Sequence, residues 1–388
     1  MKEVSERERS LPRSIIEKLT RLASESKETI SLSIGEPDFD LPKPLVKELH
    51  KITRRYKTNR LSHYTSGQGI PELREAIAQK LRKENKIKTN AEQILVTSGS
   101  QQALFAGFLA CLDPTQEVIL SNPGYLGYIP AIELVNGVPA YVPLKEEEEF
   151  NFNPDLIKKA ITRKTRVILL NSPSNPTGTV LSKKILEEVA DIAVDKDLYV
   201  FSDEAYEKLI YDDKKHVSIG SLNGMHDYVF TFHTFSKSYA LCGFRLGYVA
   251  GPQKEIDAMQ KSVHYMSLCA PHVSQLLGLK ALQLPNTYVE NMRKEYDRRR
   301  KFLVQRLNGL GLHTPMPQGA FYAFANITST KMKSLTFTNR LLKEAKVAVV
   351  PGTEFGSAGE GYIRLSYATE YHTIERAMDR FESFLKKR

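Results

Sequence analysis

The middle of the chain alternates between short apolar runs and longer stretches with helical periodicity, and this alternation restricts the possible fold more than any other feature. The apolar runs cover residues 93–99, 117–123, 165–173, 198–206 and 227–237, and the helical stretches cover 101–112, 125–137 and 183–197. Such an order indicates an α/β domain, with a mostly parallel sheet covered by helices on both faces. Ligands bind such sheets at the edge where the strands end. We therefore expect a site at that edge.

The C-terminal part of the chain has a different pattern. A charged helix is expected at about 287–308, and three short strands and a last helix follow, at 319–327, 347–352, 361–368 and 373–387. Strands mixed with flanking helices indicate a smaller α+β domain. We therefore predict a large domain at 59–285 and a small C-terminal domain at 286–388. The N-terminal segment, 1–58, is expected to pack with the small domain.

Composition limits the class of protein. A chain of 388 residues with 41% hydrophobic and 26% charged residues suggests a soluble protein of about two or three domains. Its charged start lacks the apolar region of a secretory signal, and no apolar run approaches the roughly 20 residues that span a bilayer. Cys111, Cys242 and Cys269 are too far apart for a disulfide framework or a zinc site. A cytoplasmic protein is the expectation.

The net charge of +10 raises the question of nucleic-acid binding. Lysine and arginine are spread among acidic residues, however, and the densest basic run, 298–301, lies in a helical stretch rich in Glu and Asp. A solvated helix face explains that run more simply than a phosphate site does. We expect neither nucleic acid nor a membrane as partner, and the positive charge would instead attract small anionic substrates.

Common nucleotide and metal motifs are absent from the sequence. The chain has no Gly-Lys pair for a Walker A loop, no GxGxxG that opens a helix after a strand, and neither HExxH nor CxxC. Nucleotide, nicotinamide and metal chemistry therefore lack their usual sequence support, and no metal site is expected.

The first motif with chemical content is TSGSQQAL, at 97–104, where an apolar run ends, small residues turn and a helix begins. Free backbone N–H groups and the positive end of the helix dipole make such a start a phosphate site. An ordinary helix cap by Ser98 or Ser100 would explain the same residues.

The second motif is NSPSNPTG, at 171–178, which follows another apolar run. Its proline steps and its glycine indicate a stiff, exposed turn. Such a turn would hold Asn175 in one place for a hydrogen bond, although an ordinary loop between strand and helix is the alternative.

The third motif is SDEAY, at 202–206, in which Asp203 follows an apolar run and should lie at a strand end. Burial of an unpaired carboxylate is costly, so Asp203 would need a cation, and a protonated ring nitrogen would serve. A cap on the following helix is the alternative for this motif alone.

The fourth motif lies within 231–251, where a β-rich run leads to Ser236 and Lys237, and Arg245 follows. A lysine amine condenses with an aldehyde to form a Schiff base. Arg245 could bind a phosphate through two parallel hydrogen bonds, and Ser236 adds a hydroxyl for the same anion. Two solvated cations in a loop are the simpler alternative.

Together the four motifs describe a pocket for pyridoxal phosphate. They supply a phosphate cup, a carboxylate for a pyridinium nitrogen, donors for a phenolic oxygen in Asn175 and Tyr206, and a lysine for the aldehyde. The lysine and the partner of the pyridinium nitrogen are marks of this cofactor. Each ordinary explanation is reasonable by itself, but it is improbable that all four motifs, in this order, have only their ordinary explanations.

The chain resembles the class I aminotransferases of fold type I, in the aspartate/aromatic aminotransferase superfamily. The resemblance runs nearly end to end, through the stretches 31–40, 63–78, 171–178, 202–206, 236–248 and 361–368. It implies a large cofactor-binding domain, a homodimer, and transfer of an amino group from an L-amino acid to a 2-oxo acid such as 2-oxoglutarate, through a pyridoxal phosphate Schiff base.

The resemblance also assigns site residues. It implies three catalytic residues, namely Lys237, Asp203 and Tyr206. The cofactor would be bound by Lys237, Gly99, Ser100, Gln101, Tyr125, Asn175, Asp203, Tyr206, Ser236 and Arg245, together with Tyr64, which would reach the site of the other subunit. The substrate carboxylate would be bound by Gly35, Asn175 and Arg364.

The preferred amino donor is less defined. Some members that favour acidic substrates carry a lysine where this chain has Gln101, so an aromatic or other neutral donor is expected. Thr234 stands where the family usually has Gly or Ser. The alternatives are an aspartate-preferring aminotransferase, a β-lyase on the same fold, and a ligand-binding transcription regulator, for which the chain has no room before Ser31.

Overall fold

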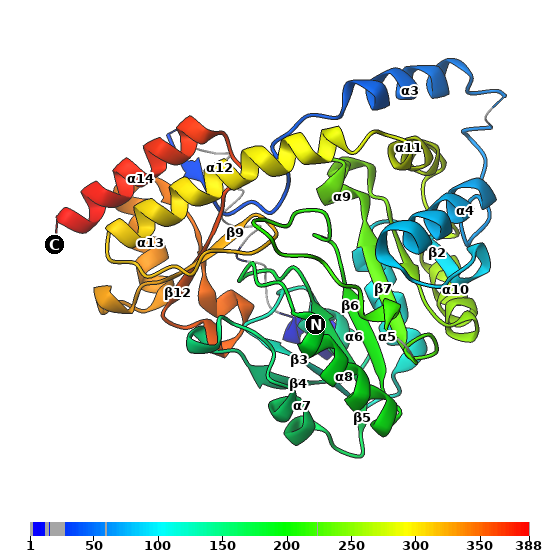
Figure 1. The fold of residues 1–388 in the computed structure, drawn as a ribbon, viewed down its shortest axis with the longest axis horizontal. Coiled ribbons are helices and arrows are strands. Elements are labelled where there is room, and N and C mark those ends of the chain that lie inside the picture. The colour runs from blue at the N-terminus through cyan, green and yellow to red at the C-terminus, as the bar shows by residue number, and fades with distance from the viewer. Residues whose placement is uncertain (1–2, 12–14, 16–27, 59, 223, 388) are drawn as a thin grey trace.

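The computed structural model describes residues 3–11, 15, 28–58, 60–222 and 224–387, and a seven-stranded sheet lies at its centre (Figure 1). Its strand order is β2-β8-β7-β6-β5-β3-β4. The strands are β2 (Ile94–Thr97), β3 (Glu117–Asn122), β4 (Val138–Pro143), β5 (Thr165–Asn171), β6 (Tyr199–Asp203), β7 (Val229–Thr234) and β8 (Gly247–Ala250). β8 runs antiparallel to the other strands and pairs antiparallel with both β2 and β7, whereas the other pairs in the sheet are parallel. The predicted α/β class with a mostly parallel sheet is confirmed.

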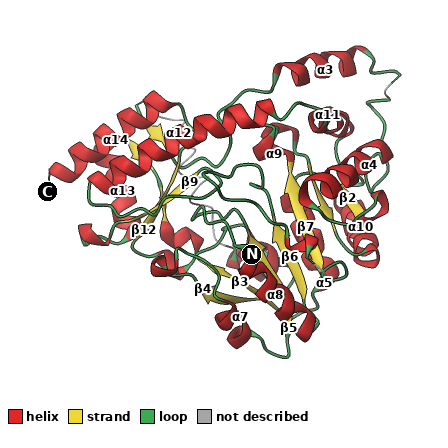
Figure 2. Cartoon of the chain, viewed as in Figure 1, coloured by secondary structure: helices red, strands yellow, loops and turns green. Residues whose placement is uncertain are grey.

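Both faces of the sheet are buried because apolar residues follow one another along its strands. In β5, Val167 and Leu169 pack in one core with Phe108 of α5 (Ser100–Cys111), whereas Ile168 packs in another core with Val189 of α8 (Lys183–Lys196). Successive side chains of a strand point to opposite faces, so one continuous apolar run serves both cores. Figure 2 shows the helices on either side of the strands.

Two strands of the sheet escaped the sequence prediction. β4 carries prolines at 139 and 143 and has mostly exposed or half-buried residues, as expected of an edge strand. β8 has four residues and begins with a glycine, so its signal is short. Both strands widen the sheet without changing its class.

The C-terminal part forms a smaller α+β unit around its own core. Its strands are β9 (Tyr322–Asn326), β10 (Val347–Ala348), β11 (Val350–Pro351) and β12 (Tyr362–Ser366), and its helices are α12 (Thr287–Gly309), α13 (Ser334–Ala345) and α14 (Tyr371–Lys386). Strand β12 pairs antiparallel with both β9 and β11. The three helices pack beside these strands, coloured yellow to red in Figure 1.

The N-terminal segment contacts both parts of the molecule. Strand β1 (Ile30–Ser31) pairs with β10, and its Ile30 joins the core of the smaller unit. Helix α3 (Lys43–Arg54) instead contacts α11 (His272–Leu282), with Leu45 in a core of the larger unit. The domain boundaries therefore stay a prediction, and residue 59, where the large domain was predicted to begin, lies outside the described residues.

Further helices and short turns complete the described structure. They are α1 (Glu6–Ser10), α4 (Pro71–Lys80), the π-helix η1 (Leu81–Asn85), α6 (Tyr128–Leu134), α7 (Pro154–Ala160), α9 (Phe235–Ser238) and α10 (Gln253–Ser267), with 3-10 turns at Ala91–Gln93, Glu146–Glu148, Ile219–Ser221, Cys242–Phe244, Thr328–Thr330, Gly352–Phe355 and Ser357–Gly359. Among the described residues, no helix combines the length and apolar character needed to cross a membrane.

Candidate active site

A cavity of about 350 Å³ opens at the edge of the sheet where β5, β6 and β7 end. Parallel strands end together, so the motifs that follow them converge there. The predicted site residues that line the cavity are Gly35, Ser100, Gln101, Tyr125, Asn175, Asp203, Tyr206, Ser236, Lys237, Arg245 and Arg364. Gly99 lies directly before helix α5 and against Arg245, at the start of the same wall.

Asp203 is the last residue of β6, and its carboxylate is buried. The Tyr128 hydroxyl donates a hydrogen bond to Oδ2 at 2.7 Å, and the Ala205 N–H donates to Oδ1 at 3.2 Å. Burial raises the pKa of Asp203 in spite of these donors. Within the described part of the chain this carboxylate forms no ion pair, so a cationic group in the cavity would stabilise its charged form.

Lys237 lies in the single turn of α9, directly after β7. Its Nζ atom donates a hydrogen bond to the Gly35 carbonyl at 2.6 Å and lies 5.9 Å from the centroid of the Phe321 ring. Gly35 itself passes close to the cavity wall, because a Cβ atom there would lie 2.6 Å from the Tyr322 hydroxyl. The amine is thus directed into the cavity from the end of β7.

The wall formed by Gly99, Ser236 and Arg245 suits an anion. Gly99 has a φ of 85°, and a Cβ atom on it would lie 2.6 Å from Nη2 of Arg245. The absence of a side chain on the glycine therefore lets the guanidinium lie close against the start of α5. The Thr234 hydroxyl accepts a hydrogen bond from the Ser236 N–H at 3.1 Å and donates one to the Ser236 Oγ at 3.0 Å. These two bonds fix Ser236 beside the same wall. A helix start and a guanidinium that face one space favour a phosphate.

Arg364 occupies the middle of β12 and is 1% exposed. Its guanidinium donates to Oδ1 of Asn175 at 3.2 Å and to the Ser33 carbonyl at 2.6 Å, and it lies 4.4 Å from the centroid of the Tyr322 ring. Burial lowers the pKa of Arg364. In the described ranges it forms no ion pair, and its Nε atom has no hydrogen-bond partner. A buried cation of this kind requires an anion, such as a substrate carboxylate.

Asn175 is held in place by the strand ends around it. Its N–H donates to Oδ1 of Asn171 at 2.8 Å, while Nδ2 of Asn171 donates to the Asp203 carbonyl at 3.1 Å. The loop at 171–178 is therefore tied to the end of β6. This arrangement places the Asn175 side chain in the cavity, beside Arg364.

Two of the predicted residues, Tyr125 and Gln101, line the cavity, whereas a third, Tyr64, does not. Tyr125 is half-buried, and burial together with the nearby Asp203 charge raises its pKa to about 12. Gln101 is exposed and donates from Nε2 to the Gly127 carbonyl at 3.2 Å. Tyr64, by contrast, does not line the cavity of its own chain and is 80% exposed.

The chain matches the family model described as aminotransferase class I and II over residues 27–381. The chain belongs to this family. It is 48% identical to an aspartate aminotransferase of Pyrococcus abyssi and 44% identical to an aromatic-amino-acid aminotransferase of Thermococcus litoralis, each match spanning 96% of both chains. The chain is also similar to the solved structure of an aromatic aminotransferase from Pyrococcus horikoshii, with a TM-score of 0.90, 47% identity, and 95% and 99% of the two chains covered.

These relatives establish the enzyme class. The protein is an aminotransferase that acts on amino acids, and the resemblance and the fold type predicted from the sequence are confirmed. The relatives carry both aspartate and aromatic-amino-acid names, so they leave the preferred donor of this aminotransferase open.

Several cavity residues of the aminotransferase were missed by sequence reasoning. The most informative are Tyr128, which donates to Asp203, and Tyr322, whose hydroxyl bonds that of Tyr206. Tyr128 lies three residues after Tyr125, within the stretch expected to be helical, and this spacing could have suggested it, although α6 begins only at Tyr128. Tyr322 lies in a strand of the small unit, where nothing local marks it. The others are Leu104, Leu126, Asn171, Ala205 and Thr234.

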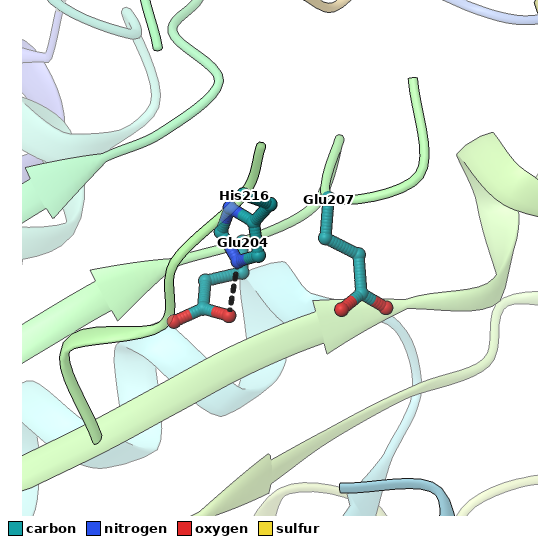
Figure 3. A group of neighbouring side chains, drawn as sticks. All are labelled: Glu204, Glu207 and His216. Atoms are coloured by element: carbon teal, nitrogen blue, oxygen red, sulfur yellow. Dashed lines mark hydrogen bonds and ion pairs between the residues drawn. The ribbon is translucent and has the colours of Figure 1, made fainter. Parts of the chain in front are cut away.

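Five ionisable side chains form a buried charge cluster around the segment that follows β6. Its members are Lys80, Glu204, Glu207, His216 and His233. Possible metal-ligating atoms of Glu204, Glu207 and His216 lie within 4.8 Å of one another, and Figure 3 shows the His216 ring directed at Glu204.

The carboxylates of the buried charge cluster already have partners. Glu204 accepts hydrogen bonds from Ser202 and Ser218 and contacts His216 at 2.7 Å. Glu207 pairs with Lys80, and Asn85 donates to it at 2.6 Å. Lys80 supplies the positive charge that a metal ion would otherwise bring, so the aminotransferase has an internal ion network there.

Proposed function

We propose that this aminotransferase uses pyridoxal phosphate to move an amino group from an L-amino acid, with aromatic or other neutral donors favoured, to a 2-oxo acid such as 2-oxoglutarate. The observation that carries the proposal is the pair of buried charges in one cavity, Asp203 and Arg364, each without an ion pair among the described residues, with the Lys237 amine directed into the same space. A cytoplasmic location stays a prediction from the sequence.

Three features of the cavity fit pyridoxal phosphate. The buried Asp203 carboxylate suits a protonated ring nitrogen, which would supply the missing cation. The start of α5 and the Arg245 guanidinium, which lie side by side at the cavity, suit the phosphate. Lys237 presents an amine that can react with an aldehyde. A cavity of about 350 Å³ also falls within the range usual for small-molecule sites.

Each residue around the cofactor would have a separate task. Asp203 would keep a proton on the ring nitrogen, while Asn175 and Tyr206 would bond the ring oxygen and Tyr125 would lie against the ring face. The phosphate would be held by Gly99, Ser100, Gln101, Ser236 and Arg245. When bound, the cofactor supplies an electron sink for the negative charge that develops at the substrate Cα atom.

Lys237 and Arg364 would act on the substrate itself. The Arg364 guanidinium, with Asn175 and Gly35, would bind the α-carboxylate and so fix the position of the Cα atom. The Lys237 amine would then take the proton from Cα as a general base and later return a proton during product formation. A base held next to Cα replaces an encounter in solution by a step within one complex.

The donor preference can be tested directly. We expect measurable activity with phenylalanine, tyrosine or leucine as donor and 2-oxoglutarate as acceptor, because Gln101 offers no charge for a second substrate carboxylate. A panel of amino donors, with the cofactor absorbance recorded alongside, measures this preference. Turnover that depends strictly on aspartate would contradict it and would favour the aspartate-preferring alternative.

A β-lyase on the same fold is the second candidate, since it would share the cofactor residues. It is distinguished by its products, because elimination breaks the Cβ–S bond of a cysteine conjugate and, with water, releases a thiol, pyruvate and ammonia without a 2-oxo acid acceptor. We expect this reaction to be slow relative to transamination with the best neutral donor.

We further infer a homodimer in which Tyr64 completes the partner's site. Its side chain is 80% exposed and lies outside the cavity of its own chain. In a dimer, the hydroxyl would bond the phosphate bound to the partner. A hydrogen bond to a charged group contributes roughly 1.5–3 kcal/mol, so Tyr64→Ala should weaken cofactor binding about ten- to a hundred-fold.

Mixed dimers test the shared site. Lys237→Ala and Tyr64→Ala are refolded together at limiting cofactor, and activity is compared with the average of the two parents. One site of the mixed dimer has lost both groups, whereas the other combines its own Lys237 with the partner's intact Tyr64. Activity should therefore exceed the average. Tyr265→Ala, which removes another highly exposed tyrosine, is the control and should keep cofactor affinity. Activity that only averages, in a sample shown to contain mixed dimers, would place Tyr64 at its own site.

A further inference from the structure

Two buried tyrosine hydroxyls meet at the cavity, one from each part of the molecule. The Tyr206 and Tyr322 oxygens are 2.8 Å apart, and either could be the donor. Their rings are nearly perpendicular, at 82°, with centroids 5.7 Å apart, and the side chains are 5% and 1% exposed. Tyr206 follows β6, whereas Tyr322 begins β9. The contact therefore links the two parts at the site.

The surroundings of Tyr322 decide which hydroxyl donates. The Arg364 guanidinium lies 4.4 Å from the centroid of the Tyr322 ring, in a position for a cation–π contact. A cation on the ring face withdraws electron density and makes the phenol a better hydrogen-bond donor. Tyr322 is consequently the better donor of the pair. Tyr206 then accepts, and its own proton remains available to an acceptor in the cavity.

We propose that Tyr322 is a positioning residue whose hydroxyl donates to Tyr206, so that the Tyr206 proton is directed at the phenolic oxygen of the bound cofactor. This inference rests on the proposed use of pyridoxal phosphate. A hydroxyl that accepts one hydrogen bond donates a stronger one, by about 10–30% per bond. Tyr322, which belongs to the small unit, thus influences the cofactor only through the Tyr206 hydroxyl.

The protonation of the bound cofactor reports this relay. A donor on the phenolic oxygen favours its anionic form and lowers the pH at which the bound cofactor loses its proton. Tyr322→Phe keeps the ring on Arg364 but removes the hydroxyl, so this pH should rise by about 0.1–0.7 units. Tyr206→Phe removes the donor itself and should raise it by about one to two units.

The experiment is a pH titration of the cofactor absorbance in the loaded enzyme, without substrate. The samples are wild type, Tyr322→Phe, Tyr206→Phe and the double variant. The double variant should match Tyr206→Phe, because Tyr322 has no route to the cofactor once the Tyr206 hydroxyl is gone. Tyr367→Phe is the control, since it removes a buried hydroxyl of the same core that bonds the Ala320 carbonyl at 3.3 Å. It should leave the midpoint unchanged.

The outcomes separate the inference from the proposed function. An unchanged midpoint in Tyr322→Phe, with a clear rise in Tyr206→Phe, overturns the role of Tyr322 and leaves the cofactor assignment intact. An equal shift caused by Tyr322→Phe in both backgrounds also overturns it, because the effect would not pass through Tyr206. A protein that gains no cofactor absorbance at all contradicts the proposed function itself.

Discussion

Replacement of Lys237 by alanine is expected to abolish transamination while the protein stays folded. The loss of a general base alone slows a reaction by about 10²–10⁴-fold, and here the covalent link to the cofactor would be lost as well. The side chain is half-buried and makes one hydrogen bond, to the Gly35 carbonyl, so its removal should have a small effect on unfolding. Single-turnover kinetics and thermal unfolding of the loaded protein measure the two effects.

Chemical labelling tests the same assignment independently of rate. Borohydride reduction of the loaded wild-type enzyme, followed by peptide mapping, should place the label on Lys237. Lys208→Ala is a matched control, since Lys208 is also largely buried and pairs with Glu84 at 3.0 Å, but outside the cavity. This variant should still be labelled at Lys237. A label on any other lysine would refute the assignment.

Replacement of Arg364 by alanine is expected to lower kcat/KM for every amino donor by about 30- to 5,000-fold. This range corresponds to the 2–5 kcal/mol lost when one partner of a buried charge pair is removed. The guanidinium is 1% exposed and bonds Asn175 and the Ser33 carbonyl, so it is held rigidly for an incoming carboxylate. Steady-state kinetics over the donor panel measures the loss.

Two further variants sharpen the Arg364 test. Arg364→Lys keeps the charge but loses the planar fork, so it should recover only part of the activity. Arg340→Ala, on the exposed face of α13 where Arg340 pairs with Glu344, is the control and should behave as wild type. All three variants should still bind the cofactor and gain its absorbance. Arg364→Ala with near wild-type kcat/KM would show that the arginine is structural.

The sequence predicts those site residues that follow strands directly. Asp203 ends β6, and Lys237 lies three residues beyond the end of β7, so the periodicity of the strands leads to their positions. The alternation of apolar runs with helical stretches also predicts the large sheet, because strands buried on both faces appear in the sequence as continuous apolar runs. Arg364 and Gly35 came only from the resemblance, since no local pattern directs either residue to the cavity.

The remaining features depend on contacts that no local pattern encodes. Tyr322 reaches Tyr206 because segments 116 residues apart in the sequence pack into one core. The course of residues 28–58 depends on such contacts too. Ile30 packs on the small unit and Leu45 on the large one, although both lie in one short segment that was expected to join only the small domain.

The buried charge cluster has a consequence for the behaviour of the enzyme on heating. Glu204 and Glu207 lie in the interior with Lys80, His216 and His233 as their partners. Removal of Lys80 would leave the Glu207 carboxylate without its lysine partner, and breaking a buried ion pair typically costs about 3–5 kcal/mol, so Lys80 and Glu207 are expected to tolerate exchange only together. The hydration of ions becomes less favourable as temperature rises, and the penalty for keeping them dry falls. The cluster joins α4, the segment after β6, and β7. The free-energy cost of keeping its charges away from water is therefore smallest at high temperature.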